Sequence, residues 1–315
     1  MCKTPDLVIV GSVALDSVRT PYGEHERILG GSACYAGVAA SYFTQVGIVG
    51  VIGRDFPQAH LDLLASRGID LAGVHRQDGT TFHWKGYYEG AMDRAITVDT
   101  HLGVFESFSP DIPEDYRSAP YLFLGNIHPA LQLRVLSQLT EKTIVALDTM
   151  NYWIKIQPDL LHDVIAKIDL LFINEAEIQQ LTGVKNLPEA ADRILKDGPR
   201  FVVLKRGGHG ATVHGAEGVV AAPALPLRDV KDPTGAGDTF AGGFLGYLAQ
   251  SGPDLSLERL REALWMGTAL ASHTVQDFSL LGLCRASSES IFQRCRQIAQ
   301  MVNGRVPNVR ITGHE

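Results

Sequence analysis

Residues 231–250 form the stretch whose residue types and spacing are best suited to chemistry. Pro233 cannot lie inside a helix, while Gly235 and Gly237 allow backbone angles and close approaches that a Cβ would forbid. A helix is therefore predicted to begin near Ala236, directly after a tight turn. A helix that starts in this way presents unpaired backbone N–H groups and the positive end of its dipole. Such a helix start favours the binding of phosphate or another oxyanion.

Asp238 is the carboxylate in the first turn of this predicted helix. An aspartate at such a position often does no more than cap the helix. Beside an anion site, however, a carboxylate suits a general base that takes a proton from a hydroxyl while adjacent amides stabilise the group being transferred. The combination therefore indicates phosphoryl transfer.

The helix that carries Asp238 must be held in place by the core. Apolar residues recur along it at helical spacing, which predicts a buried face; they are Phe240, Phe244, Leu245 and Leu248. Gly242, Gly243 and Gly246 leave another face flat for packing against a neighbouring element. A buried helix is therefore expected to position the loop.

The run Asp232-Pro-Thr-Gly-Ala-Gly-Asp-Thr-Phe-Ala-Gly-Gly resembles the C-terminal signature of the ribokinase-like (PfkB) carbohydrate kinases. In that family the aspartate matching Asp238 deprotonates the acceptor hydroxyl, and the backbone matching Gly235, Ala236 and Gly237 forms the anion hole. The resemblance implies a three-layer α/β/α fold with a mostly parallel central sheet and a small β-sheet lid. It also implies ATP-dependent phosphorylation of a carbohydrate-like alcohol, with Mg²⁺ bound together with ATP.

Length, composition and charge agree with a small-molecule enzyme. The 315 residues, of which 45% are hydrophobic, can bury a sizeable core. The formal net charge of −7 gives no basic surface for nucleic acid or an anionic membrane. Four cysteines are scattered without a C-x-x-C pair, and no apolar run approaches ~18 residues. A cytoplasmic protein is therefore expected.

The first strand and the segment after it contain candidates for substrate binding. Leu7–Val10 is predicted to be a buried strand, and Asp16 follows its carboxyl end, where open α/β sheets bind ligands. From the residues alone Asp16 is equally well a turn or capping aspartate. The resemblance assigns it to substrate hydroxyls, and places Gly30, Gly31 and Ser32 at a helix start that faces the sugar.

One departure from the family bears on the acceptor. Ribokinases carry a Lys after the two glycines and an Asn further along, where this chain has Ser32 and Tyr35. The departure argues against free ribose as the substrate.

Residues 74–105 contain short β segments rich in Thr and aromatic residues. Together with the resemblance, these β segments predict a lid made of two segments, at about 14–29 and 78–105. Both segments are inserted into a single domain that spans residues 1–315. The strand within it has two different faces, one of which includes Phe82, Trp84 and Tyr88. This aromatic face suits either a cover over a ligand or a homodimer contact, and the sequence leaves both open.

From Pro120 onward strands and helices alternate, which predicts parallel βαβ units. The polar groups that follow the strands are expected to line one edge of the sheet, and they include Asn126 and Asn151, which the resemblance places near the substrate. Asn174 and Glu177 have the spacing of a capping box. They also match a family motif whose carboxylate organises waters on Mg²⁺, and both roles are compatible.

Two further groups concern the phosphate donor and a cation. The strand 201–205 ends in a Gly-rich turn, and the resemblance assigns Lys205, Gly207, Gly208 and Gly210 to the nucleotide side of the site, with adenine beside the loop 275–282.

Asp232 lies six residues before Asp238, where several family members hold K⁺; a turn aspartate before Pro233 is the alternative.

The acceptor is predicted to be a neutral sugar, on the basis of family frequency. A nucleoside is the alternative, because a base could stack on the aromatic lid residues for ~1–3 kcal/mol. A kinase-shaped regulator that has lost catalysis is the third possibility, and the intact Asp238 argues against it.

Overall fold

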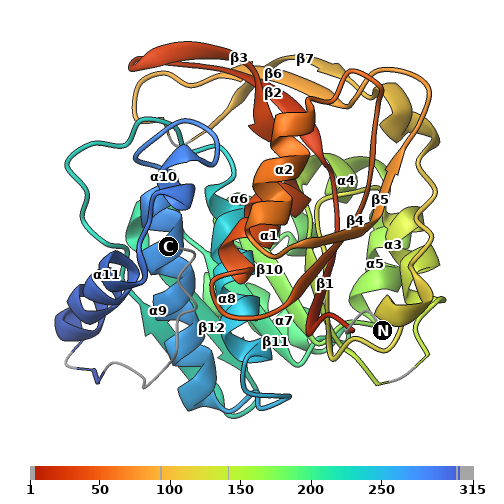
Figure 1. Ribbon diagram of the computed structural model, residues 1–315. Coiled ribbons are helices and arrows are strands. Elements are labelled where there is room, and N and C mark those ends of the chain that lie inside the picture. Colours follow the sequence, from red (N-terminus) through yellow and green to blue (C-terminus); the bar gives the residue numbers. More distant parts are fainter. Residues whose placement is uncertain (1–3, 93, 141, 303, 306–315) are drawn as a thin grey trace.

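The computed structural model describes residues 4–92, 94–140, 142–302 and 304–305. Cys2, one of the four cysteines, lies outside these residues. A sheet of nine strands forms the centre (Figure 1). In spatial order its strands are β13 (Gly218–Ala222), β12 (Ala211–Gly215), β11 (Phe201–Lys205), β10 (Leu170–Asn174), β9 (Ile144–Asp148), β8 (Tyr121–Leu124), β1 (Leu7–Val10), β4 (Val46–Ile52) and β5 (Asp70–Arg76).

The seven strands from β11 to β5 are parallel, while β12 and β13 continue the sheet antiparallel as a hairpin edge. The central strands are buried on both faces, and their alternate residues enter two different apolar clusters. In β1, for example, Leu7 and Ile9 face one cluster, while Val8 and Val10 face the other. This two-sided burial explains why these strands read as continuous apolar runs.

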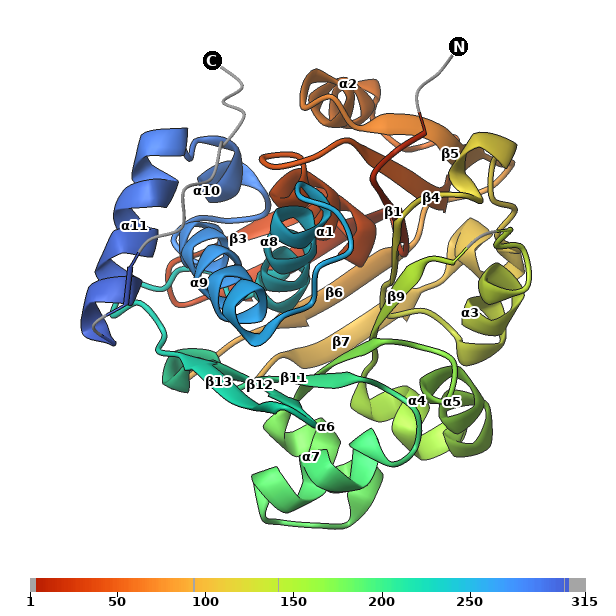
Figure 2. The same cartoon turned by 90° about the horizontal axis from the view of Figure 1, so that it is seen from below.

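Helices cover both faces of this sheet, which gives three layers (Figure 2). One face carries α1 (Ser32–Ala40), α2 (Gln58–Ser66), α8 (Ala236–Ala249), α9 (Leu257–Thr274), α10 (Leu281–Cys284) and α11 (Ser288–Met301). The other carries α3 (Pro129–Leu136), α4 (Asn151–Ile156), α5 (Pro158–Ile165), α6 (Glu175–Thr182) and α7 (Leu187–Leu195). Short 3-10 turns occur at Gly103–Ser107, Glu114–Tyr116 and Gly207–His209.

A second, four-stranded sheet lies across the top of the molecule in Figure 1. Its order is β3 (Gly23–Gly30), β2 (Ala14–Thr20), β6 (His83–Tyr87) and β7 (Ile96–His101). The β2–β3 and β6–β7 pairs are antiparallel, and the central β2–β6 pair is parallel. We refer to this sheet as the lid. Its strands come from two separate stretches of the chain, near the two predicted segments.

Helix α8 packs unusually close to its neighbours because three of its glycines face them. A Cβ on Gly242 would lie 2.1 Å from the Ala36 carbonyl oxygen of α1, and one on Gly246 would lie 2.7 Å from the Ala40 Cα. On the α9 side, a Cβ on Gly243 would lie 2.6 Å from Leu270. The prediction that α8 is buried and has a flat, glycine-rich face for packing is confirmed. The close packing fixes the position of its N-terminus.

The predicted three-layer α/β fold with a largely parallel sheet and a small second sheet is confirmed. Helices α7 and α11 were not among the predicted elements, and α5 begins and ends earlier than expected. In the sequence, Gly53-Arg-Asp55 at the end of a strand predicts that Asp55 caps the following helix, and this prediction is wrong because α2 begins after Pro57 without a side-chain cap. Asp55 instead accepts hydrogen bonds from the Thr81 backbone and hydroxyl and pairs with Arg27, which ties it to the lid.

The division into one domain of 315 residues with two inserted segments remains a prediction. Among the helices of the described residues, none has both the length and the apolar character that crossing a membrane requires.

Candidate active site

The predicted polar residues gather at the carboxyl edge of the parallel strands, beneath the lid. Asp148 ends β9, Asn174 ends β10 and Lys205 ends β11, so these three side chains lie on neighbouring strands. Asn126 lies two residues after β8, the next strand in the sheet. The sheet order therefore brings together groups that are up to 79 residues apart in the sequence.

The turn before α8 has the geometry that its glycines predict. Gly235 is the N-cap residue in the left-handed region, with φ 73°, and a Cβ there would lie 2.4 Å from the Tyr35 ring. The Ala236 N–H donates to Pro233 within the turn. Within the described residues we find no acceptor for the backbone N–H groups of Gly235, Gly237 and Asp238. The turn therefore offers free amides to an anion.

Lys205 adds a positive charge directly beside this turn. A Cβ on Gly237 would lie 3.3 Å from the Lys205 Nζ. The ammonium is held by Asp148, with an Nζ–Oδ2 distance of 2.6 Å, and both side chains are largely buried. Burial alone would lower the pKa of Lys205, but the carboxylates of Asp148, Glu177 and Asp238 outweigh it and raise that pKa. Lys205 therefore stays charged at the anion site.

Asp238 is partly buried at the start of α8, next to these groups. Burial raises its pKa to about 7; the charges of Asp148 and Glu177 add to the effect, and Lys205 opposes it. A carboxylate with a pKa near 7 is a stronger base than an ordinary aspartate and is still ionised in half of the molecules at that pH. These properties suit a general base that works close to neutral pH.

Asp16 reaches the same place from the lid strand β2. Its side chain is only 5% exposed. Burial raises its pKa to about 7, the charges of Asp232 and Asp238 add to this, and the Gly31 N–H opposes it. The charges of Asp232 and Asp238 thus reach Asp16, which places the N-terminal and C-terminal candidates near one another.

Gly30, Gly31 and Ser32 lie where the sequence places them, next to Asp16. A Cβ on Gly30 would lie 1.9 Å from the Asp16 Oδ2, so only glycine leaves room for this carboxylate. Gly31 has φ 96° and is the N-cap residue of α1. The Ser32 Oγ accepts from the Ser12 N–H and packs against Gly11 and Gly125. Ser32 thus joins the ends of β1 and β8 to the start of α1.

We refer to the molecule outside the lid as the body, and to the turn before α8 as the anion turn. The lid contacts the body on both sides of this turn. Thr234, in the turn, donates its hydroxyl to the Tyr88 Oη at 3.3 Å. On β3, the His25 and Phe278 rings lie 4.2 Å apart, and Ser279 donates to the Leu29 carbonyl at 2.5 Å. These contacts were not predicted from the sequence.

Trp84 forms a flat plate on the lid face that carries Asp16. Trp84 is opposite Asp16 in the β2–β6 register, and residues that are opposite each other project from the same face of a sheet. A Cβ on Gly86 would lie 2.2 Å from the indole, so the ring lies over Gly86. The Trp84 Nε1 donates to the Thr97 Oγ1 at 3.1 Å, which fixes the ring. Phe82 packs elsewhere, with Phe105.

The two asparagines near the predicted acceptor site differ in their surroundings. The Asn126 side chain accepts from the Trp153 Nε1 at 2.9 Å and donates to the Met150 Sδ at 3.1 Å. Asn151 is exposed at the first position of α4, and its backbone carbonyl accepts from Gln180. Asn126 is therefore held firmly at the sheet edge, whereas Asn151 projects toward solvent.

Asn174 and Glu177 form the predicted capping box of α6. Each side chain accepts from the backbone N–H of the other, at 2.9 Å for the Asn174 Oδ1 and 3.0 Å for the Glu177 Oε2. Burial raises the pKa of Glu177 to about 7, Lys205 opposes this shift, and Asp148 adds to it. The structural role is confirmed, and the carboxylate also belongs to the charged cluster around Lys205.

The Gly-rich turn after β11 is open. A Cβ on Gly207 or Gly208 would meet no atom within 4 Å, so the space above both residues is free. Gly210 has φ 89° and lies against the Ala222 carbonyl, which closes the turn toward β12.

Asp232 is buried just before the anion turn, with 1% of its surface exposed. Its Oδ1 accepts from the Thr234 N–H at 2.9 Å, and its Oδ2 has no hydrogen-bond partner among the described residues. Burial raises the pKa of this carboxyl, and hydrogen bonds from the Thr234 side chain and from the Thr234 and Ser279 backbone N–H groups oppose the rise. An orphaned buried carboxylate oxygen has the chemistry that a monovalent cation would satisfy.

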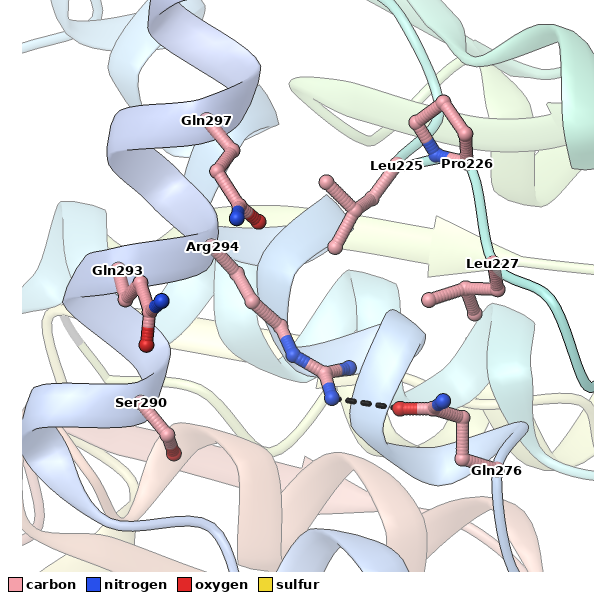
Figure 3. A pocket seen from close by; sticks show the side chains of 8 residues that line it. All are labelled: Leu225, Pro226, Leu227, Gln276, Ser290, Gln293, Arg294 and Gln297. Atoms are coloured by element: carbon pink, nitrogen blue, oxygen red, sulfur yellow. Dashed lines mark hydrogen bonds between the residues drawn. The ribbon is translucent and has the colours of Figure 1, made fainter.

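A cavity of about 320 Å³ lies between α11 and residues 225–227 (Figure 3). Figure 3 shows Arg294 pointing from α11 toward Gln276, with Leu225 and Leu227 on the other side. Arg294 donates to the Gln276 Oε1 at 2.5 Å and to the Ser272 Oγ at 2.8 Å. No Asp or Glu lines this cavity, so it is separate from the carboxylate cluster.

Three comparisons with known proteins agree with this geometry. Residues 4–282 match the family model described as pfkB family carbohydrate kinase. The chain is similar to a cytidine kinase of Thermococcus kodakarensis, with 34% identity over 273 residues, 82% of this chain and 96% of that protein. It is also similar to a ribokinase of Arabidopsis thaliana, with 32% identity over 306 residues, 86% of this chain and 76% of that protein.

Among solved structures, a putative ribokinase II from E. coli in complex with ATP and Mg²⁺ superposes with a TM-score of 0.76. Its sequence is 18% identical, and the match covers 94% of this chain and all of that chain. Taken together, fold, site and family model identify a phosphotransferase. The chain belongs to the PfkB family of carbohydrate kinases.

Proposed function

We propose that this protein transfers a phosphoryl group from ATP to a hydroxyl of a nucleoside. The main support for a nucleoside as the acceptor is that Asp16 and the Trp84 indole lie on the same face of the lid. Asp16 suits the vicinal hydroxyls of a ribose, and a flat indole fixed at the Nε1 suits a stacked base. The similarity to a cytidine kinase supports the same choice.

In this proposal Asp238 accepts the proton of the attacking hydroxyl. Its raised pKa matches that task near neutral pH. The free N–H groups of Gly235, Gly237 and Asp238 stabilise the negative charge of the phosphoryl group during transfer. Lys205, held by Asp148, adds a fixed positive charge next to them. Positioning and electrostatics therefore supply the catalysis.

The residues present fit ATP and Mg²⁺. The open space above Gly207 and Gly208 and the Lys205 ammonium lie on one side of the anion turn. A structural relative is described in complex with ATP and Mg²⁺. When bound, Mg²⁺ would neutralise phosphate charge, and Glu177, with Asn174, would hold its waters. The adenine of ATP would lie near Gln276, which belongs to the loop 275–282 and lines the cavity beside α11.

We also propose that Asp232 holds K⁺ next to the anion turn, because its buried Oδ2 has no hydrogen-bond partner in the part of the chain that the structure describes. The cation would offset the carboxylate charge close to where phosphate binds.

The predicted sugar acceptor is the second candidate, and the similarity to a ribokinase favours it. Asn126 and Asn151 are candidates for acceptor contacts in either case. The test is ATP consumption by the purified protein with pentoses, hexoses, keto-sugar acids, inositols and nucleosides. We expect turnover with nucleosides to exceed that with every free sugar. Turnover with free sugars alone would overturn the nucleoside and leave the sugar.

A homodimer through the lid also remains a proposal. All six residues of the edge strand β7 are exposed, and Val98 exposes 59% of its surface. Unpaired edge strands are templates for pairing with another chain. Sedimentation velocity of the wild-type protein and of Val98→Lys tests this; a monomer at all concentrations would rule it out.

A further inference from the structure

Asn126 is the one acceptor-site candidate whose side-chain amide has a fixed orientation. A Trp Nε1–H only donates hydrogen bonds, so the Asn126 atom that it contacts at 2.9 Å must be the oxygen. The other amide atom contacts the Met150 Sδ, which only accepts. Both contacts demand the same orientation, which removes the usual ambiguity between the two ends of an asparagine amide.

The amide keeps hydrogen-bonding capacity beyond these two contacts. A side-chain amide has two N–H donors and two lone pairs on oxygen. In the described residues, Trp153 uses one lone pair and Met150 uses one N–H. One acceptor and one donor are left, and Trp153 sets which end of the amide carries each.

Asn126 lies at the acceptor side of the site. It directly follows Gly125, and a Cβ on Gly125 would lie 2.8 Å from the hydroxyl of Ser32. Ser32 begins α1 immediately after the Gly30–Gly31 pair that packs on Asp16. The strand β8 that leads into Asn126 pairs with β1 on one side and β9 on the other. The amide therefore stands at the carboxyl edge of the large sheet, on the side where Ser32 and the Gly30–Gly31 pair lie.

Resting on the nucleoside acceptor proposed above, we propose that Asn126 selects bases that carry an exocyclic amino group next to an acceptor ring nitrogen. Cytosine presents this pattern at N4 and N3, and adenine presents it at N6 and its neighbouring nitrogen. The amide oxygen accepts from the amino group while the amide N–H donates to the ring nitrogen.

Keto bases are rejected in the same pose. Uracil and hypoxanthine present a carbonyl where the amino group was and an N–H where the ring acceptor was. Their carbonyl then faces the amide oxygen, and their N–H faces the amide N–H. An asparagine that was free to rotate could correct the mismatch by flipping, but flipping Asn126 would turn its NH₂ group toward the Trp153 N–H. Trp153 is therefore a positioning residue for base selection.

The central test uses Trp153→Phe, which keeps an aromatic ring against His128 and Tyr152 and removes the Nε1–H donor together with part of the indole. We measure kcat/KM of the wild-type protein for cytidine, uridine, adenosine and inosine with ATP. We expect cytidine over uridine, and adenosine over inosine, by roughly 5- to 150-fold, the range of one bidentate base contact. In Trp153→Phe both ratios should fall toward one, through faster turnover of the keto nucleosides, with cytidine changed less than about threefold.

If Trp153→Phe unfolds under the assay conditions, a second variant still tests the proposal. Asn126→Ala should lower kcat/KM for cytidine, leave kcat/KM for uridine nearly unchanged and abolish the ratio. A purely structural role for the Trp153–Asn126 contact predicts instead that all four nucleosides lose activity equally in both variants.

The failure of this proposal and that of the proposed function are distinct. Equal wild-type turnover of amino and keto nucleosides would overturn base selection by Asn126 and leave the nucleoside kinase standing. Turnover of free sugars without any nucleoside would overturn both.

Discussion

The carboxyl edge of the large sheet and the lid differ in how firmly they hold their residues. At the sheet edge, charged groups emerge from strands that are buried along their length, and Lys205 and Asp148 fix each other at 2.6 Å. In the lid, the edge strand β7 is exposed at all six positions, although β2 is largely buried and contacts such as Tyr88–Thr234 join the lid to the body. Phosphoryl transfer needs fixed charges, whereas the choice of acceptor needs a surface that can differ between relatives. In the function proposed above, the body supplies the chemistry, and the lid together with Asn126 at the sheet edge supplies the selection of the acceptor.

The largest effect should come from removing the base in the body. Asp238→Asn keeps the size and position of the side chain but cannot accept the hydroxyl proton. We expect kcat to fall by ~10²–10⁴-fold, with the KM values for ATP and acceptor little changed. Asp163→Asn, on the exposed face of α5, is the matched control and should retain full activity. An Asp238→Asn enzyme with near wild-type kcat would remove Asp238 from the chemistry.

The pH dependence should report the same carboxylate. Because burial raises the pKa of Asp238 to about 7, its base form is lost as pH falls below that value. We expect kcat/KM to fall at least about tenfold per pH unit below about 7, and more steeply if Asp16, whose pKa is also about 7, must ionise as well. A rate–pH profile measured from pH 4 upward checks this. A flat profile down to an ordinary aspartate pKa would contradict the role of burial.

A smaller effect is expected from K⁺ at Asp232. Exchange of K⁺ for a large organic cation at constant ionic strength should lower kcat/KM for ATP by roughly 5-fold or more, a typical size for coupling between neighbouring sites. Asp232→Asn should remove the difference between the two cations. Equal wild-type rates in both salts would show that Asp232 binds no activating cation.

The smallest effect concerns stability. The pKa of Asp238 is raised in the folded protein, so the unfolded chain loses its proton first as pH rises. The resulting destabilisation grows as pH rises from about 4 toward 7 and is complete above 7. Asp238→Asn should therefore melt at a higher temperature than the wild type at pH 8, with a difference that shrinks toward pH 4. A variant that melts lower than the wild type at pH 8 would contradict this.

The local structure that positions the proposed chemistry in the body could be predicted from the sequence, because neighbouring residues determine it. A helix start at Gly235–Gly237 follows from glycines, a proline and the apolar spacing behind them, and the structure has this start at Ala236. The capping box of Asn174 and Glu177 is also set by spacing alone. Neither case requires knowing which distant segment lies nearby.

The geometry of the lid and of the acceptor side of the site could be predicted from the sequence only in part, because it depends on pairing between strands that are distant along the chain. The register that places Trp84 opposite Asp16 joins residues 68 apart, and no local pattern encodes it. Local chemistry assigned Asp55 to a helix cap, but its carboxylate binds Thr81 across the lid. From the sequence, Trp153 behind Asn151 is predicted to serve packing, whereas its Nε1–H donates to the Asn126 side chain; a polar residue shortly after a strand is the one sequence signal of this contact.

The division between body and lid is tested most directly by Trp84→Ala, assayed with a nucleoside and with ATP. Trp84 lies on the lid face that carries Asp16 and contributes no group to the anion turn, so we expect its loss to remove base stacking of ~1–3 kcal/mol and to leave the chemical step intact. The account predicts a KM for the nucleoside that rises roughly 5- to 150-fold, with kcat and the KM for ATP changed less than about threefold. An unchanged KM for the nucleoside, or a fall in kcat without a rise in that KM, would contradict it.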